Sequence, residues 1–166
     1  MKQSKIIATC GMMTALAVVI MIIGALMGIG MYVSPMFAGL CLVPIGEKFG
    51  KKYHICLWLA VSMLSFMLVP ELEQNLMFVC VFGSYPILYS CFQKLSPKIR
   101  IVAKLLYFNV VIIALEYIIM TLLVPEVFEP IWLAVLLLGA NFVFVCYDKI
   151  IPNTGKIMKR FRTVSK

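Results

Sequence analysis

Charged residues are scarce in this sequence, and so are the side chains that bind metals. Only 13% of the 166 residues are charged and 63% are apolar, with a mean hydropathy of +1.04. A soluble domain has about 25% charged residues, so this composition indicates a chain whose solvent is lipid. There is one histidine, His54, and no two of the six cysteines lie within ten residues of each other. We therefore expect no haem, zinc or copper site, no metal ligand and no cofactor.

The sequence also lacks the glycine-rich loops that hold nucleotides, G-x-x-x-x-G-K and G-x-G-x-x-G. Any ATP-driven step would therefore need an ATPase from another subunit. The net charge of +8 does not indicate nucleic acid, because the basic residues form short clusters between long apolar runs. Cytoplasmic loops of membrane proteins have this pattern.

Uncharged runs divide the chain into about six expected membrane helices. The 41 residues 6–46 carry no charge, and as a helix they would extend about 62 Å, enough for two crossings of a core of about 30 Å. Gly28 to Pro35 is the natural break between these two. We expect an all-α polytopic bundle, a single transmembrane domain over residues 1–166, with helices near 6–27, 33–46, 54–69, 75–92, 101–124 and 130–148. Residues 149–166 would form a basic cytoplasmic tail, and the second helix is the least secure crossing.

The connections between these runs alternate in charge. Basic residues are found in the first, third, fifth and last polar segments, namely Lys2 and Lys5; Lys48, Lys51 and Lys52; Lys94, Lys98, Arg100 and Lys104; and Lys149 to Lys166. The connections between them are neutral or acidic, with Glu71 and Glu73 in one and Glu126 and Glu129 in another. Because basic loops stay in the cytoplasm, both termini are predicted to lie there, in a multi-pass protein of the cell membrane.

Three polar residues lie where lipid would disfavour them. Glu116 is well inside the fifth apolar run, and a carboxylate at such a depth costs a few kcal/mol unless it faces a cavity or a partner. Asn109 precedes it by seven residues, so the two share a helix face, and Asn141 lies in the sixth run. These residues either bind a small ligand inside the bundle or only join the helices by hydrogen bonds.

The fourth expected helix contains Pro86, which removes a backbone hydrogen bond and predicts a kink. A broken helix is tolerated where it lines a cavity, and there Ser84 and Tyr85 could present hydroxyls to a ligand. A packing kink without a ligand is the alternative. Glu71 and Asn75 belong to a polar loop after Pro70 that either lines the mouth of a site or is simply solvated.

The first helix has Gly11-x-x-x-Ala15, two small residues where another helix can approach closely. Six short helices, both ends inside, this small-residue strip and the missing ATPase motif together resemble the substrate-binding S components of energy-coupling factor transporters. The resemblance implies a vitamin-like small molecule bound from outside, a transmembrane coupling subunit docked at Gly11 and Ala15, and partner ATPases. Under this hypothesis the polar residues within and beside the apolar runs would form the ligand site, namely Glu116, Asn109, Asn141, Tyr85, Ser84, Glu71 and Asn75.

Two other functions remain open from the sequence. A membrane scaffold comparable to the cell-shape protein MreD needs only helix surfaces and basic loops. An enzyme acting on lipid would need a nucleophile with a base or a metal cluster, and neither is evident. We therefore expect a protein that is not an enzyme.

Overall fold

The computed structural model describes residues 3–28, 32–122 and 130–164, and within them every regular element is helical. The connection that contains Glu126 and Glu129 lies outside the described residues. Counting α4, η1 and α5 as one interrupted helix gives six helical segments. The elements are α1 (Gln3–Met27), α2 (Val33–Phe49), α3 (Lys51–Leu68), α4 (Leu72–Met77), the π-helix η1 (Phe78–Phe82), α5 (Tyr85–Phe92), α6 (Pro97–Leu122) and α7 (Pro130–Val164).

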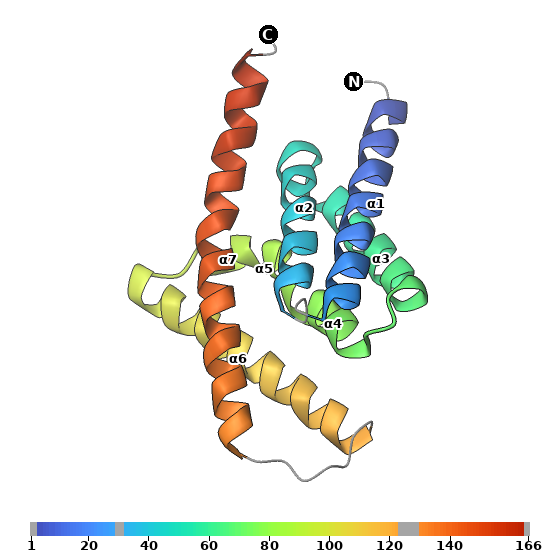
Figure 1. Ribbon diagram of the computed structural model, residues 1–166. Coiled ribbons are helices and arrows are strands. Elements are labelled where there is room, and N and C mark those ends of the chain that lie inside the picture. The colour runs from blue at the N-terminus through green and yellow to red at the C-terminus, as the bar shows by residue number, and fades with distance from the viewer. Residues whose placement is uncertain (1–2, 29–31, 123–129, 165–166) are drawn as a thin grey trace.

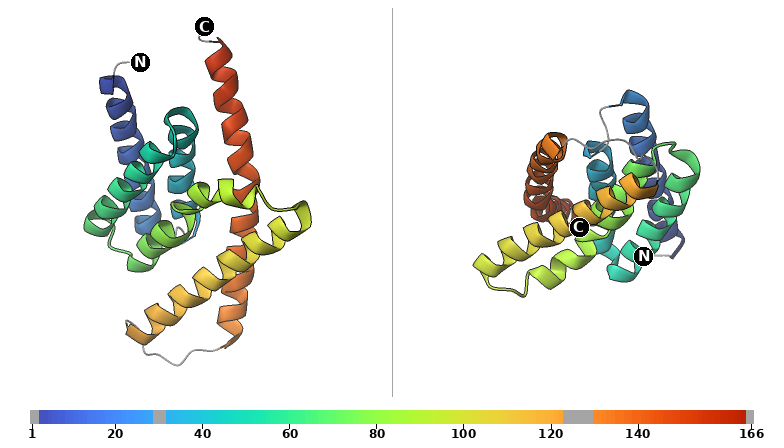
Figure 2. Two further views of the ribbon diagram at one scale, coloured as in Figure 1. Left: turned by 180° about the vertical axis from the view of Figure 1, so that it is seen from behind. Right: turned by 90° about the horizontal axis from the view of Figure 1, so that it is seen from below.

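Successive segments run up and down, so that both ends of the chain lie at the same end of the molecule (Figure 1). Helices α1, α2 and α7 stand roughly side by side, whereas α3 and α6 are inclined to them, as the views from behind and below also show (Figure 2). The chain reverses at Gly28, with φ of +65°, and at Gly50, with φ of +102°. Both values lie in the left-handed region that glycine adopts without strain.

The core consists of two groups of apolar side chains that share α2 and η1. One group joins α1, α2 and α3 through residues such as Met21, Leu42 and Val61. The other joins α2 and η1 to α5, α6 and α7, and includes Phe108 and Phe144, whose stacked rings lie 4.2 Å apart. The interrupted segment α4–η1–α5 therefore lies at the junction of the two halves.

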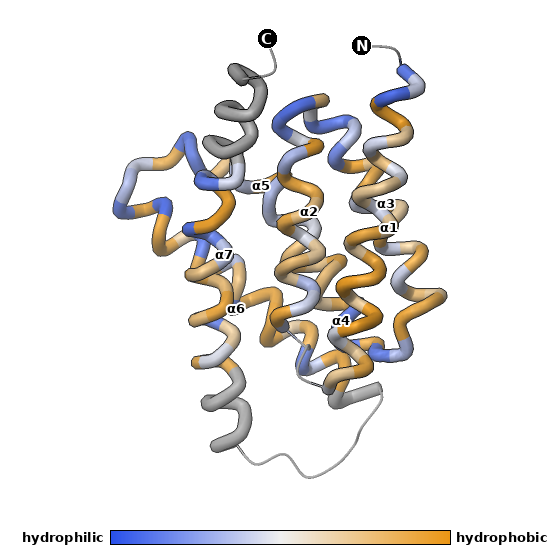
Figure 3. Tube along the Cα trace, turned by 45° about the horizontal axis from the view of Figure 1, so that its top comes forward, coloured by the Kyte–Doolittle hydropathy of each residue, from blue (hydrophilic) through white to orange (hydrophobic). Residues whose placement is uncertain are grey.

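Hydrophilic residues gather at opposite ends of the helices (Figure 3). We call the end with both termini the basic end, because the turn between α2 and α3, with Lys48, Lys51 and Lys52, lies toward it (Figure 1). The other end, with Glu71 and Glu73, is the acidic end. Between them many large apolar side chains point outward, and Met12, Met63 and Phe142, for example, are more than 70% exposed.

Two described helices are long and apolar enough to cross a membrane, judged by length and composition: α1, and α6 over Pro97–Ile119. The expected fourth crossing is divided among α4, η1 and α5, of 6, 5 and 8 residues. The all-helical class predicted from the sequence is confirmed, and these two helices give weak support to membrane association.

Several helix boundaries differ from those expected. Helix α2 continues beyond residue 46 to Phe49, through Pro44. Helix α3 begins at Lys51 rather than at residue 54. Helix α7 does not end at residue 148 but continues to Val164, so most of the expected tail is helical. Hydropathy shows where an apolar segment ends, whereas a helix continues through polar residues until a cap or a turn stops it.

Candidate functional site

The interruption of the fourth segment leaves backbone carbonyls that three other helices satisfy. In η1 the N–H of Gly83 donates to the carbonyl of Phe78 at 2.7 Å, the five-residue spacing of a π-helix. Pro86 has no N–H, so it leaves the carbonyl of Phe82 without its helical donor. The kink that Pro86 predicts is therefore present, and it is spread over a whole turn before the proline.

Side chains supply the missing donors. The hydroxyl of Tyr147 in α7 donates to the Phe82 carbonyl at 2.6 Å, and the indole N–H of Trp58 in α3 donates to the Val79 carbonyl at 3.2 Å. The carbonyl of Cys80 accepts from Tyr107 of α6 at 3.0 Å and from Ser84 at 2.7 Å. Ser84, predicted to face a ligand, thus turns its hydroxyl to its own helix and lies 3.3 Å from that of Tyr107.

Close approach of these elements depends on two glycines. A Cβ atom at Gly39 in α2 would lie 2.6 Å from the carbonyl oxygen of Phe82 and 2.7 Å from the hydroxyl oxygen of Tyr147. A Cβ atom at Gly83 would lie 2.5 Å from Cδ1 of Trp58. Both distances are too short for real contacts, so the interrupted segment can pack against α2 and α3 only where these residues are glycine.

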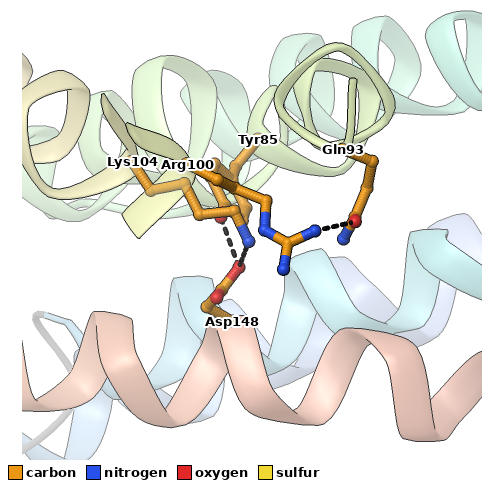
Figure 4. A network of polar contacts seen from close by, with 5 residues as sticks. All are labelled: Tyr85, Gln93, Arg100, Lys104 and Asp148. Atoms are coloured by element: carbon orange, nitrogen blue, oxygen red, sulfur yellow. Dashed lines mark hydrogen bonds and ion pairs between the residues drawn. The ribbon is translucent and has the colours of Figure 1, made fainter. Parts of the chain in front are cut away.

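Tyr85, another predicted ligand contact, is fully buried and belongs to a polar group near the basic end. Its hydroxyl donates to Oδ1 of Asp148 in α7, and the same oxygen is paired with the ammonium of Lys104 in α6 at 2.6 Å. Figure 4 shows Tyr85 and Lys104 converging on Asp148, while Arg100 bonds Gln93 at 2.7 Å to one side.

Lys104 is only 6% exposed, and its ammonium also lies 4.4 Å from the centroid of the Tyr89 ring. A buried ammonium is stable only when it is paired, and here a carboxylate and an aromatic face share that task. The group ties α5, α6 and α7 together.

Asn109 and Asn141 form a reciprocal amide pair between α6 and α7. Each side-chain NH₂ donates to the oxygen of the other amide, at 3.1 and 2.9 Å, and each also donates to the carbonyl four residues before it, at 2.8 Å. Two of the three polar residues that the sequence places inside the bundle are thus in direct contact. Both donors of each amide are used within the protein, which is the geometry of a helix-to-helix clamp.

Glu116 lies seven residues, about two turns, further along α6, at the acidic end, and is 6% exposed. Its Oε1 accepts a hydrogen bond of 3.1 Å from the hydroxyl of Tyr32, which immediately precedes α2. Burial, together with the charges of Glu116 and Glu73, raises the pKa of Tyr32. Burial, with the charges of Glu116 and Glu71, raises the pKa of Glu73 to about 7. Three segments far apart in the sequence thus meet at one buried carboxylate.

The other residues of the predicted mouth have different environments. Glu71 is exposed and precedes α4, where its carbonyl accepts from the backbone N–H of Asn75. Asn75 is 1% exposed, and its NH₂ donates to the carbonyl of Val69 at the end of α3, at 3.1 Å. Its neighbour Gln74 reaches the carbonyl of Met21 in α1 at 2.7 Å. The polar loop expected to contain Asn75 is thus helix α4 from Leu72 onward. The structure brings the start of α4 and Glu116 to the same end but places Asn109, Asn141, Ser84 and Tyr85 elsewhere.

Gly11 and Ala15 lie on an exposed part of α1. A Cβ atom at Gly11 would meet no other atom within 4 Å, and α1 instead uses Thr14, Ala17, Val18 and Met21 for packing in the bundle. The small-residue strip is thus not used by the described parts of the chain.

Sequence reasoning missed Tyr32, Glu73, Lys104 and Asp148 as site residues. By its charge Lys104 is expected in a basic loop cluster, and Asp148 is expected only as the last residue of the sixth helix. Their opposite charges, close to the ends of the helices expected at 101–124 and 130–148, are the available signal for a pair. Nothing in the sequence indicated that Tyr32 would reach Glu116, which is 84 residues away in the chain.

Fold and site together define an all-helical, largely apolar protein with polar groups inside it, two of whose helices can span a membrane. Among the residues described, no three histidine, cysteine or acidic side chains are grouped as metal ligands. Comparisons with protein families, curated proteins and solved structures gave no match.

Proposed function

We propose that this chain is a six-crossing protein of the cell membrane that binds a small polar molecule at its acidic end, in the manner of a transporter S component. The basic end faces the cytoplasm and the acidic end faces outward. A transmembrane coupling subunit docks on Gly11 and Ala15, and partner ATPases drive uptake.

The observation that carries this proposal is the convergence on Glu116. A buried carboxylate in a membrane helix is energetically unfavourable unless a cavity, a ligand or a partner stabilises it. Among the contacts described, Glu116 accepts a hydrogen bond only from the Tyr32 hydroxyl. Tyr32 immediately precedes α2, and Glu73 lies in the first turn of α4. Tyr32 and the first turn of α4 lie with Glu116 at the end where a ligand would enter from outside, so they are suited to contact a ligand bound at Glu116.

Orientation is supported by loop charge and by the position of the chain ends. Both ends lie with the basic connections, and the described acidic connection lies at the opposite end (Figures 1 and 3). Cytoplasmic retention of basic loops gives this arrangement a direction across the membrane.

The test compares Glu116→Gln with Tyr117→Phe. Both changes remove a polar function with little change in volume, but Tyr117 is 71% exposed, whereas Glu116 is 6% exposed. In cells supplied with a panel of labelled vitamins, uptake of the substrate that the wild-type protein transports should fall at least tenfold with Glu116→Gln. It should stay within twofold with Tyr117→Phe. Normal uptake by a folded Glu116→Gln protein would show that the Glu116 carboxylate does not bind the substrate.

A scaffold function, comparable to that of MreD, is favoured by a different observation. The polar groups of α6 and α7 bond one another, so they stabilise the bundle without requiring a ligand. Purification from the native membrane in mild detergent distinguishes the two functions. Copurified ATPases with a coupling subunit support uptake, and cell-wall or division proteins support the scaffold.

A further inference from the structure

Helix α7 is longer than one membrane crossing needs. Its 35 residues extend about 52 Å, whereas the hydrocarbon core of a bilayer is about 30 Å thick and takes about 20 residues to cross. Its C-terminal part continues past α2 at the basic end, as the front and back views both show (Figures 1 and 2). Ile151 is the residue furthest along α7 in the described core. We call residues 152–164 the α7 extension.

The sequence of the α7 extension separates apolar positions from basic ones. With a helical turn of about 100° per residue, its four large apolar residues fall within an arc of about 120°, and its four basic residues fall on the rest of the circumference. The apolar residues are Ile157, Met158, Phe161 and Val164, and the basic residues are Lys156, Lys159, Arg160 and Arg162. The extension contains no acidic residue. This pattern is typical of helices that lie in the surface of a membrane.

The extension begins where a helix bends most readily. Pro152 lies inside α7, and because proline has no N–H, the backbone carbonyl of Asp148 lacks its helical donor. Gly155 follows within one turn and lowers the stability of the helix relative to alanine. The backbone hydrogen bond that a bend would break at Pro152 is therefore already missing. A straight extension, by contrast, would hold its apolar positions in water, which is unfavourable.

Two partners suit a basic helix with an apolar side: an anionic lipid leaflet, or the acidic surface of another protein. The position of the extension favours the leaflet. The extension directly follows the part of α7 that is long enough to cross the bilayer, so the headgroups are within its reach. The membrane surface offers acyl chains to one side of the helix and negative charge to the other, and each lysine or arginine near it adds to the attraction.

From the length of α7, the separated positions and the proline where the extension begins, we propose that the α7 extension bends at Pro152 and lies on the anionic leaflet at the basic end. Its apolar side rests on the acyl chains, and its basic side meets the phosphates of the headgroups. This inference rests on the crossing of the membrane by α7 but not on uptake, because Glu116 lies at the opposite end of the molecule.

The test measures backbone amide exchange by mass spectrometry on the full-length protein in lipid nanodiscs of phosphatidylcholine, alone or mixed with phosphatidylglycerol. In phosphatidylcholine the extension should exchange quickly, because so short a helix is marginally stable without packing. With phosphatidylglycerol its exchange should slow by about tenfold or more. Equal rates in the two lipids, whether fast or slow, overturn the proposal, and fast rates in both make an acidic protein surface the partner to seek. Slow exchange of residues 137–147 in both lipids shows that the crossing itself is in place.

Two triple variants separate the extension from the other charges of the basic end. One replaces Lys156, Lys159 and Arg160 by glutamine, and the other replaces Lys48, Lys51 and Lys52, which are exposed in the turn between α2 and α3. The first should abolish the slowing by phosphatidylglycerol, and the second should change it by less than about twofold. Equal losses would mean a general attraction of the basic end to anionic lipid and would overturn the proposal.

The separation of the two sides is tested by exchanging two neighbouring residues. Arg160→Phe combined with Phe161→Arg keeps the composition and the net charge but puts an arginine in the middle of the apolar side. The slowing by phosphatidylglycerol should fall by about fivefold or more, because the apolar side can no longer lie on acyl chains. Undiminished slowing in this variant would show that charge alone holds the extension and would overturn its placement in the membrane surface.

Discussion

The hydroxyl of Tyr147 donates to the carbonyl oxygen of Phe82 at 2.6 Å, although 65 residues separate them in the chain. This carbonyl is the one that Pro86 leaves without a helical donor, and both residues are fully buried. A helix break at the centre of an apolar protein is acceptable only when its polar groups are satisfied internally. Helix α7 therefore supplies, through the Tyr147 hydroxyl, the hydrogen-bond donor that an unbroken helix would supply from its own backbone.

Replacing Tyr147 tests that relationship directly. Tyr147→Phe keeps the ring that packs against Phe82, with centroids 5.3 Å apart, but leaves the carbonyl buried without a donor. We expect a loss of about 1–3 kcal/mol in unfolding free energy, measured by denaturation in detergent micelles. The exposed Tyr117→Phe should change it by less than about 0.5 kcal/mol. Equal effects of the two would contradict the assignment.

The close contact between Gly39 of α2 and the Phe82 carbonyl leads to a second prediction. Gly39→Ala would place a Cβ atom 2.6 Å from the Phe82 carbonyl oxygen, forcing α2 and η1 apart. Overpacking of this kind costs about 1–3 kcal/mol.

Gly11→Ala is the matched control, because its Cβ atom meets nothing within 4 Å. In an exposed helix position alanine is favoured over glycine by about 1 kcal/mol, so this variant should be as stable as the wild-type protein or more so. Thermal unfolding of the two variants in parallel gives the comparison, and a destabilised Gly11→Ala with a normal Gly39→Ala would refute it.

The sequence was sufficient for the helical class and for the kink at Pro86, because both follow from local composition. It could not supply the partners of the kinked segment. Tyr107, Tyr147 and Trp58 come from three other helices, and a single sequence contains no information about which helices touch. For the same reason the sequence favours Tyr85 and Ser84 as ligand contacts. In the structure the Tyr85 hydroxyl donates to Asp148 and the Ser84 hydroxyl donates to the Cys80 carbonyl.

Charges near helix ends were a further source of error. The charges between helices orient the chain, so Lys104 is interpreted as part of a basic connection and Asp148 as the end of the sixth helix. In the structure, the two form an ion pair between α6 and α7. A charged side chain near the end of an apolar run can either be solvated or form an ion pair with a neighbouring helix. Which of the two occurs depends on how the helices pack.

The reciprocal pair of Asn109 and Asn141 predicts strong coupling between the two positions. Replacing either amide by leucine leaves the other with unused polar groups, whereas replacing both removes the need for them. A double-mutant cycle of Asn109→Leu and Asn141→Leu should therefore show a coupling energy of about 0.6–2 kcal/mol in unfolding free energy. Additive effects of the two changes would show that the amides do not act as a unit, and the ligand role would then be favoured.

The last prediction concerns the acidic end and its pH dependence. The pKa of Glu73 is raised from 4.5 to about 7, first by burial and then by the charges of Glu116 and Glu71. The folded protein thus holds this proton more tightly than the unfolded chain does. The resulting stabilisation is complete below pH about 4.5 and is lost as the pH rises through about 7. The melting temperature of the wild-type protein should therefore fall over this range relative to that of Glu73→Gln, which has no carboxyl to ionise. Glu71→Gln removes an exposed neighbouring charge and should retain most of the decline. Parallel curves for the wild-type protein and Glu73→Gln would mean that Glu73 ionises normally and is not held near Glu116.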